Sequence, residues 1–413
     1  MIRNIVEQHS QDAAFLWLTR ESILNAPHYS LQDVADHEER IEAHIDGLRV
    51  AGDIGWEVCE QDLSIEQAGE IFVAAVLAFE SGDKQKIEKV LTLVKETPDF
   101  VAPLVSALAW IDIQLAQPIN LSLLNSNESR YRQIGLMACV IHGQNPGDFL
   151  TAGVHDSDPL LSANAIRAVG ELKRRDLLPL LLSKFDHEDE NVQFWAAWSA
   201  VLLGGDVAAL KKLASFVKPG SMYTVDVFQL LLRVMNGVNA QDWLKTLVKQ
   251  EDLLRQVLIG TGITGDPIYI PTLLHHMSIP EFARVAGEAF CLVTGLKLEN
   301  DAFIAEPPDN FEAGPTEDPA DENVAMDPDR NLPWPDALKV KEWWVKNQHL
   351  FQAGARYLLG NPISQNHCLD ILKTGMQRHR IAASFEIALM QPATPLFQVI
   401  APAVKQKALL QLG

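Results

Sequence analysis

Cysteine is scarce in this chain, with four in 413 residues, and the four lie far apart in the sequence. None has the Cys-x-x-Cys spacing of a zinc or redox site. Long apolar runs are absent too, since the longest strictly apolar run, 71–79, has nine residues. A helix that spans a membrane needs about 20, so we expect no membrane-spanning helix. We expect small buried thiols in a reducing compartment at Cys59, Cys139, Cys291 and Cys368.

The first residues also lack an apolar signal core. Residues 1–9 mix charged, polar and apolar side chains, whereas a secretory signal has a continuous apolar stretch of about 7–15 residues. We therefore expect a cytoplasmic protein.

Basic residues are in the minority, with 34 lysines and arginines against 54 acids and a net charge of −20. Half of that charge lies in residues 299–330, which hold eleven acids and one base, Arg330. Nucleic-acid binding requires a basic groove or stripe, and none is visible, so we expect no nucleic-acid partner. Residues 299–335 also contain seven prolines and few core-forming side chains. Such a composition predicts an extended acidic loop.

The sequence does contain a near repeat. Residues 158–170 align with residues 32 positions later, so that Asp158 falls on Glu190 and Ala165 on Ala197. An acidic turn followed by an alanine-rich helix, repeated at this period, is typical of a solenoid of stacked helix pairs. We therefore predict an all-α solenoid whose function lies on an extended surface.

Interruptions of the repeat divide the chain into four predicted segments. Residues 1–65 lack the repeat, so we predict a helical amino-terminal cap that covers the first core face. Residues 66–298 form the repeat array, 299–335 the acidic, proline-rich loop and 336–413 the carboxy-terminal helical repeats. Within the last segment, we expect 353–359 to be helical.

Gly260 to Gly265 matches the dinucleotide-binding pattern Gly-x-Gly-x-x-Gly. That pattern binds a pyrophosphate only between a strand and a helix. Here it follows an apolar stretch typical of the end of a repeat helix and precedes Asp266-Pro267, the usual start of the next repeat. We interpret it as a repeat boundary, and we expect no cofactor.

These features resemble HEAT-repeat proteins, in which antiparallel helix pairs stack into a curved rod. The acidic turns, the Gly-Asp-Pro block at 265–274 and an Arg or Gln at a fixed helix position carry the resemblance over roughly 125–295. A narrower resemblance covers nearly the whole chain and points to an uncharacterised bacterial HEAT-repeat family. In Gram-negative bacteria that family is often encoded beside type VI secretion spike and effector genes, and it has no established catalytic residues. The segments that carry it are 14–18, 26–29, 40–49, 194–200 and 356–360.

Two His-Glu pairs, His37-Glu38 and His187-Glu188, resemble those with which a HEAT-repeat hydroxylase similar to deoxyhypusine hydroxylase binds two irons. Such a site needs four pairs to supply enough nitrogen and oxygen ligands. We therefore interpret both pairs as solvated turn residues and expect no metal site.

The resemblance implies a non-enzymatic scaffold that binds another protein, as an adaptor or chaperone for a type VI secretion spike or effector. Two alternatives stay open. One is an immunity protein that neutralises a secreted toxin. The other is a HEAT-type enzyme that acts on nucleic acid or on a metal-dependent substrate.

The candidate partner-binding residues lie in and beside the acidic loop. Adjacent helical side chains point about 100° apart, so Trp343 and Trp344 cannot face the core equally and we expect one to be exposed. Exposed tryptophans are frequent binding hot spots, although a purely structural role is the alternative. The predicted set is Trp334, Trp343, Trp344, Arg356, Glu317, Asp318, Asp321 and Glu322.

Overall fold

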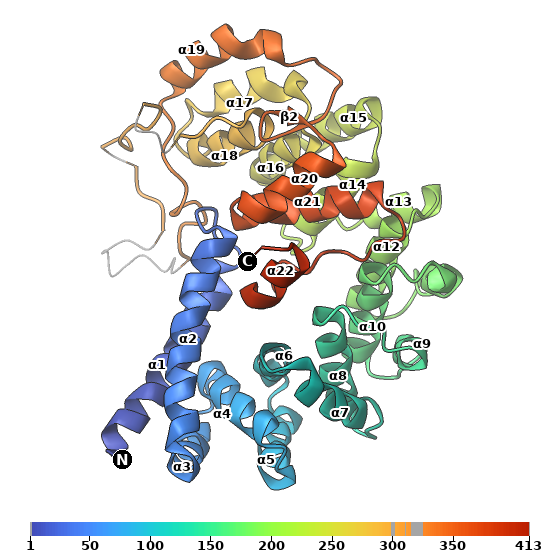
Figure 1. Cartoon of the computed structure of the whole chain (residues 1–413). Coiled ribbons are helices and arrows are strands. Elements are labelled where there is room, and N and C mark those ends of the chain that lie inside the picture. Colours follow the sequence, from blue (N-terminus) through green and yellow to red (C-terminus); the bar gives the residue numbers. More distant parts are fainter. Residues whose placement is uncertain (1, 299–301, 310, 315–324, 413) are drawn as a thin grey trace, which may run out of the picture. The chain divides into compact units, whose positions relative to one another are not determined.

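The computed structural model describes residues 2–298, 302–309, 311–314 and 325–412, and these are mostly helical (Figure 1). They divide into two compact units, which we call unit 1 (residues 1–209 with 372–413) and unit 2 (residues 210–371). This division follows packing, whereas the four segments predicted from the sequence follow composition and stay a prediction.

Unit 1 contains a stack of helix pairs. One helix of each pair packs against the corresponding helix of the next pair: α4 (Ala68–Ser81), α6 (Val101–Trp110), α8 (Ser129–Ile141), α10 (Pro159–Glu171) and α12 (Glu190–Leu202). The other helices alternate with these along the chain: α5 (Lys84–Glu96), α7 (Ile113–Leu124), α9 (Asp148–Val154), α11 (Leu178–Leu182) and α13 (Val207–Ala214). The last of them, α13, begins in unit 1 and continues into unit 2. The 3-10 turns η2 (Pro98–Phe100) and η3 (Arg175–Leu177) precede α6 and α11. The predicted all-α solenoid is confirmed.

Acidic turns start the helices, as the repeat predicts. Asp158 accepts hydrogen bonds from the amides of Leu160 at 2.9 Å and Leu161 at 3.3 Å. Pro159 follows at the first helical position, where no amide hydrogen bond is lost. The equivalent Asp189 accepts the amide of Val192 at 3.0 Å.

An arginine on one helix and an aspartate in the following turn join consecutive repeats. Arg132 on α8 donates to Asp156 Oδ2 at 2.5 Å and to the carbonyl of Ser126 at 2.9 Å. The other oxygen of Asp156 accepts the amide of Asp158 at 3.0 Å. The arginine therefore ties its own preceding turn to an Asp-x-Asp turn of the next repeat.

The amino-terminal helices cover the start of this stack. They are α1 (Arg3–Ile23), α2 (Leu31–Ala51) and α3 (Asp53–Asp62), followed by η1 (Leu63–Ile65), and both α1 and α3 pack on α4. A capping box starts α2, because Ser30 accepts the amide of Asp33 while Asp33 accepts the amide of Ser30. The core-facing stripe of α2 is fully buried.

Unit 2 continues the same alternation. Its successively packed helices are α14 (Thr224–Val234), α16 (Leu254–Thr264) and α18 (Ala283–Thr294). Between them lie α15 (Gly237–Leu247), η4 (Glu251–Leu253), η5 (Pro267–Tyr269) and α17 (Ile270–His276). After the acidic loop come α19 (Ala337–Asn347), η6 (Gln348–Leu350), β1 (Tyr357–Leu358) and β2 (Asn361–Pro362). The chain then passes through α20 (Gln365–Thr374) into unit 1, where α21 (Gln377–Met390) and α22 (Ala403–Leu409) lie.

The prediction of a helix over 353–359 is wrong, because β1 and β2 form a short antiparallel hairpin there. The amide of Tyr357 donates to the carbonyl of Gly265 at 2.9 Å, and that of Leu359 donates to Leu292 at 2.7 Å. The last carbonyls of a helix have no partner within the helix. Hydrogen bonds to the ends of α16 and α18 therefore outweigh the local helical preference.

The interpretation of Gly260 to Gly265 as a repeat boundary is confirmed. These residues form the last turns of α16, and Gly265 ends the helix in a left-handed conformation with φ 70°. A Cβ atom at Gly262 would lie 2.9 Å from the Cα of Ala289 on α18. Glycine at 262 therefore lets two helices approach closely.

The cysteines lie mainly in the core. Cys59, Cys139 and Cys368 are buried and Cys291 is half-buried. Burial raises the pKa of Cys59 to about 12 and that of Cys139 to about 11, so both thiols stay protonated near neutral pH.

Candidate protein-binding site

The part of unit 1 that follows α21 consists of turns, irregular chain and one short helix. We call residues 391–412 the C-terminal segment; it includes α22 and is the dark red end of the chain in Figure 1. The amide of Leu396 donates to the carbonyl of Glu171, at the end of α10, at 2.8 Å. The amide of Ala403 donates to Glu38 on α2 at 2.6 Å. This segment therefore contacts helices that are far apart in the sequence.

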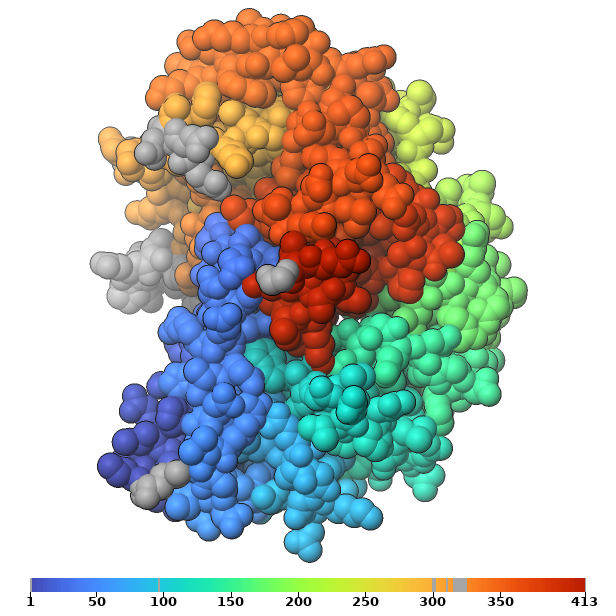
Figure 2. All heavy atoms as spheres, in the orientation of Figure 1, coloured from blue at the N-terminus to red at the C-terminus, as the bar shows by residue number. Residues whose placement is uncertain are grey.

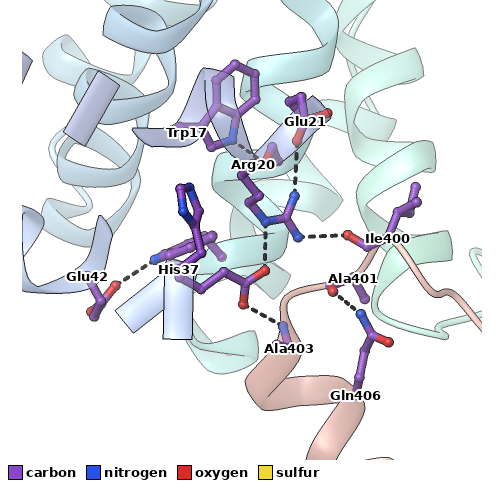
Figure 3. Close-up of polar contacts among 12 residues, drawn as sticks. Trp17, Arg20, Glu21, His37, Glu42, Ile400, Ala401, Ala403 and Gln406 are labelled. Atoms are coloured by element: carbon purple, nitrogen blue, oxygen red, sulfur yellow. Dashed lines mark hydrogen bonds and ion pairs between the residues drawn. The ribbon is translucent and has the colours of Figure 1, made fainter. Parts of the chain in front are cut away.

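A buried ion pair between α1 and α2 holds the main chain of this segment (Figure 3). Arg20 Nε lies 2.7 Å from Glu38 Oε1, and the side chains are only 3% and 7% exposed. The guanidinium also donates to the carbonyl of Ile400 at 2.9 Å and to Glu21 at 3.0 Å. Since Glu38 Oε2 accepts the amide of Ala403, the pair binds the carbonyl of Ile400 in the turn before α22 and the amide of the first residue of α22.

Aromatic rings support this ion pair. Trp17 stacks on Phe72 with centroids 5.0 Å apart, and Phe72 meets Trp110 edge-on at 5.4 Å. The Arg20 guanidinium lies 5.8 Å from the centroid of Trp110. The indole of Trp110 donates to Glu42 at 2.6 Å. These contacts fix the charged groups in position.

Lys405 of the C-terminal segment binds the end of α6. Its Nζ donates to the carbonyl of Ile111 at 3.0 Å and to that of Ala109, where a positive charge complements the helix dipole. Burial lowers the pKa of Lys405 to about 8. Lys405 Nζ is also 3.3 Å from His142 Nδ1, and burial together with this charge lowers the pKa of His142. His142 is therefore neutral near pH 7 and accepts this hydrogen bond.

A second buried arginine shapes the turn before α22. Arg380 on α21 is fully buried, donates to the carbonyl of Leu372 at 2.8 Å and pairs with Gln406 on α22. Gln406 donates in turn to the carbonyls of Val399 at 2.9 Å and Ala401 at 2.5 Å. Burial lowers the pKa of Arg380 to about 10. The C-terminal segment is thus held from both sides.

A pocket of about 390 Å³ opens between α2, the end of α6 and the C-terminal segment. In the space-filling view, the dark red C-terminal segment lies against α2, in blue, and against array residues in teal (Figure 2). The lining residues are Ala35, Glu38, Glu39, Glu42, Trp110, Pro402, Val404 and Lys407.

This pocket combines apolar walls with three glutamates and one lysine, Lys407. Trp110 and Val404 supply apolar surface, and Val404 is 69% exposed. Glu39 is exposed at the rim, whereas both oxygens of Glu42 already accept hydrogen bonds, from Trp110 and Arg49. A site of this size and composition suits an apolar side chain with a positive end, such as arginine or lysine.

The predicted tryptophans belong to unit 2, whereas the residues that line this pocket belong to unit 1. Trp343 and Trp344 on α19 are both half-buried, and their rings meet Phe290 of α18 at 6.0 and 6.2 Å. The expectation that one of them is exposed is wrong, because the Phe290 ring is wide enough to contact both. A role for them in partner binding stays a prediction.

The other predicted residues are not brought together with these two. Trp334 is half-buried beside Arg284, whose guanidinium lies 5.3 Å from its ring centroid. Arg356 donates to the carbonyl of Thr264 at 2.9 Å and so caps α16. The predicted acids Glu317, Asp318, Asp321 and Glu322 lie outside the described residues.

The interpretation of His37-Glu38 as a solvated turn is wrong, because both residues are buried within α2. His37 bonds to the carbonyl of Leu16 at 2.8 Å. Sequence reasoning also missed Arg20, although Trp17 and Arg20 lie three residues apart on one helix face. A charge on an apolar face needs a buried partner, and this was the available signal.

His187 and Glu188 do lie in a turn, half-buried and exposed respectively. Among the residues that the structure describes, no three His, Cys, Asp or Glu side chains gather as a metal site.

Comparison with protein families matches residues 147–221 to the model of HEAT repeats. The matched part runs from α9 to the turns after α13. No curated protein and no solved structure matches the chain. Within the described ranges, every helix is too short or too polar to cross a membrane. HEAT repeats typically form non-catalytic surfaces that bind other proteins. The chain is therefore an all-α solenoid of which residues 147–221 match the model of HEAT repeats.

Proposed function

We propose that the protein is a non-enzymatic adaptor or chaperone that binds a type VI secretion spike or effector protein. The HEAT repeats support a protein-binding scaffold, and the resemblance of the sequence to a family encoded beside secretion genes supports the partner. The observation that carries the proposal is the way unit 1 already binds main-chain groups of its own C-terminal segment, in the turn before α22 and at the start of that helix.

The mode of that binding is general. Arg20 and Glu38 contact only a carbonyl and an amide of the C-terminal segment, and these groups occur at every residue except the amide of proline. Side-chain specificity therefore depends on the pocket beside them. Three glutamates and one lysine line it, so the excess of acids favours a basic residue of the partner, and its apolar wall favours a long aliphatic stem.

Copurification with a defined partner tests the proposal. The tagged chain should retain the purified spike or effector protein at low salt, and Glu39→Arg should weaken binding at least about tenfold by reversing the rim charge. Glu188→Arg is the matched control, because Glu188 is exposed in a repeat turn and is not part of the pocket. The proposal is contradicted if the tagged chain retains neither the spike nor the effector protein. It is also contradicted if Glu39→Arg and Glu188→Arg weaken binding equally.

Deletion of the gene separates the adaptor from the immunity alternative. Loss of effector secretion is expected for an adaptor, whereas poisoning of the cell by its own toxin indicates an immunity protein. Normal secretion without poisoning contradicts both functions.

A further inference from the structure

The described end of the acidic loop lies on α16 and α18 of unit 2 through two ion pairs. Arg284 Nη1 is 2.7 Å from Asp327 Oδ2, and the two side chains are 11% and 12% exposed. Arg255 pairs with Asp329, which is 5% exposed. Although the composition of the loop predicts little burial, Asp327 and Asp329 are largely covered where they meet arginines of the array.

The geometry of this turn repeats that of a repeat boundary. In unit 1, Arg132 binds Asp156, whose other oxygen accepts the amide of Asp158 at 3.0 Å. In the loop, Arg284 binds Asp327, whose other oxygen accepts the amide of Asp329 at 2.9 Å. The Asp-Pro-Asp turn of the loop thus takes the position relative to Arg284 that an Asp-Ser-Asp turn takes relative to Arg132.

The two turns differ in the structure of the chain that comes after them. Asp158 caps α10 directly, so its turn is fixed to a helix of the core. After Asp329 the chain continues without a helix until α19 begins at Ala337, and Asp336 is the residue that caps α19. The loop's turn therefore caps no helix, and it can be exchanged without unwinding one.

The surface beneath this turn has further capacity for an acidic ligand. The Nε atoms of Arg255 and Arg284 are buried, and among the described residues neither has a hydrogen-bond partner. A carboxylate that binds an arginine through two parallel hydrogen bonds would use such a donor. Phe311 and Trp334 lie 5.5 and 5.3 Å from the Arg284 guanidinium and fix its plane.

We propose that Arg255 and Arg284 form a docking site for an acidic Asp-x-Asp turn of a partner protein, which the loop's own turn at 327–329 occupies as an intramolecular competitor. The site takes a pair of carboxylates two residues apart, as the bound turn shows. Because a tethered competitor acts at millimolar effective concentration, a partner binds appreciably only when it presents its turn with additional contacts or when the loop's turn is removed.

A labelled peptide with the sequence of residues 325–335 tests this site on the full chain. We expect it to bind Asp327→Asn/Asp329→Asn at least about tenfold more tightly than the wild type, because the variant has lost the competitor. The gain in affinity should be lost when Arg255→Ala/Arg284→Ala is added to that variant. It should also be lost when both aspartates of the peptide are replaced by asparagine. The matched control is Glu306→Gln/Asp309→Asn, which removes two exposed acids of the same loop and should leave binding at the wild-type level. The proposal is overturned if the peptide binds equally tightly to the wild type and to a folded Asp327→Asn/Asp329→Asn variant.

A measurement on the wild type keeps the test independent of how the variants fold. Excess peptide at several millimolar should accelerate amide hydrogen exchange in residues 325–332, because it displaces the loop's turn. Unchanged exchange there overturns the proposal. Light scattering on a mixture of the wild type and the Asp327→Asn/Asp329→Asn variant tests for dimers. Dimers of the two chains would show that the site binds a second copy of this chain, and so overturn its assignment to another protein. These outcomes concern unit 2 and leave the proposed role of the pocket in unit 1 untouched.

Discussion

Arg20 and Glu38 form an ion pair in which both side chains are buried, and each side chain also bonds to the main chain of the C-terminal segment. Removing one member of a buried pair leaves the other charge uncompensated, at a cost of about 3–5 kcal/mol. Glu38→Ala should lower the free energy of unfolding by this amount in urea denaturation. Glu39→Ala, one residue away and exposed, should change it by less than about 0.5 kcal/mol. Equal effects of the two substitutions would show that the pair is not buried as described.

Lys405 makes the stability of unit 1 depend on pH. Burial lowers its pKa from the ordinary 10.5 to about 8, so between pH 8 and 10.5 the unfolded chain binds more protons than the folded chain. Stability therefore rises with pH through this window. In Lys405→Met this part of the rise should be missing, which urea denaturation at pH 7.5 and 10 measures. Lys407→Met is the control, since Lys407 Nζ donates to the exposed side chain of Gln32 at 2.9 Å. Parallel pH profiles for wild type and Lys405→Met would rule out a buried charge at this position.

At the scale of single residues, the sequence predicts local roles better than distant pairings. The aspartate cap at 158 follows from its neighbours in the chain, and the structure confirms it. Glu38 was misinterpreted because its two partners, Arg20 and Ala403, lie 18 and 365 residues away. No local pattern contains that information.

Among the helices, close approach depends on small residues. A Cβ atom at Gly262 would lie 2.9 Å from the Cα of Ala289, and a backbone atom cannot move aside cheaply. Gly262→Ala should therefore destabilise unit 2 by about 1–3 kcal/mol. Gly237→Ala is the control, because the nearest atom to its added Cβ is 4.0 Å away, and it should be neutral or slightly stabilising. Thermal unfolding followed by circular dichroism measures both, and equal melting temperatures for the two variants would contradict this packing.

Whole elements were predictable where their signals are local. The acidic turns and alanine-rich helices of the array appear in the structure at the expected places. The hairpin at 357–362 was not predictable, because its amides bond to carbonyls at the ends of α16 and α18. The sequence of the hairpin itself carries no sign of these partners.

At the scale of the molecule, the repeat period indicated the solenoid, but nothing in it indicated that the C-terminal segment returns to α2. A chain that ends at residue 390 should lose at least about 3 kcal/mol of unfolding free energy, because the Arg20–Glu38 pair loses its backbone partners. A chain that ends at residue 411 is the control. Equal urea midpoints would show that the segment does not stabilise unit 1.

Hydrogen exchange with and without the spike or effector protein tests the central claim most directly, namely that unit 1 binds a partner at the pocket beside its C-terminal segment. Binding should slow amide exchange in residues 35–42 of α2, at the end of α6 and in residues 396–407, and Glu39→Arg should remove this protection. Complex formation without protection in these three segments would contradict it.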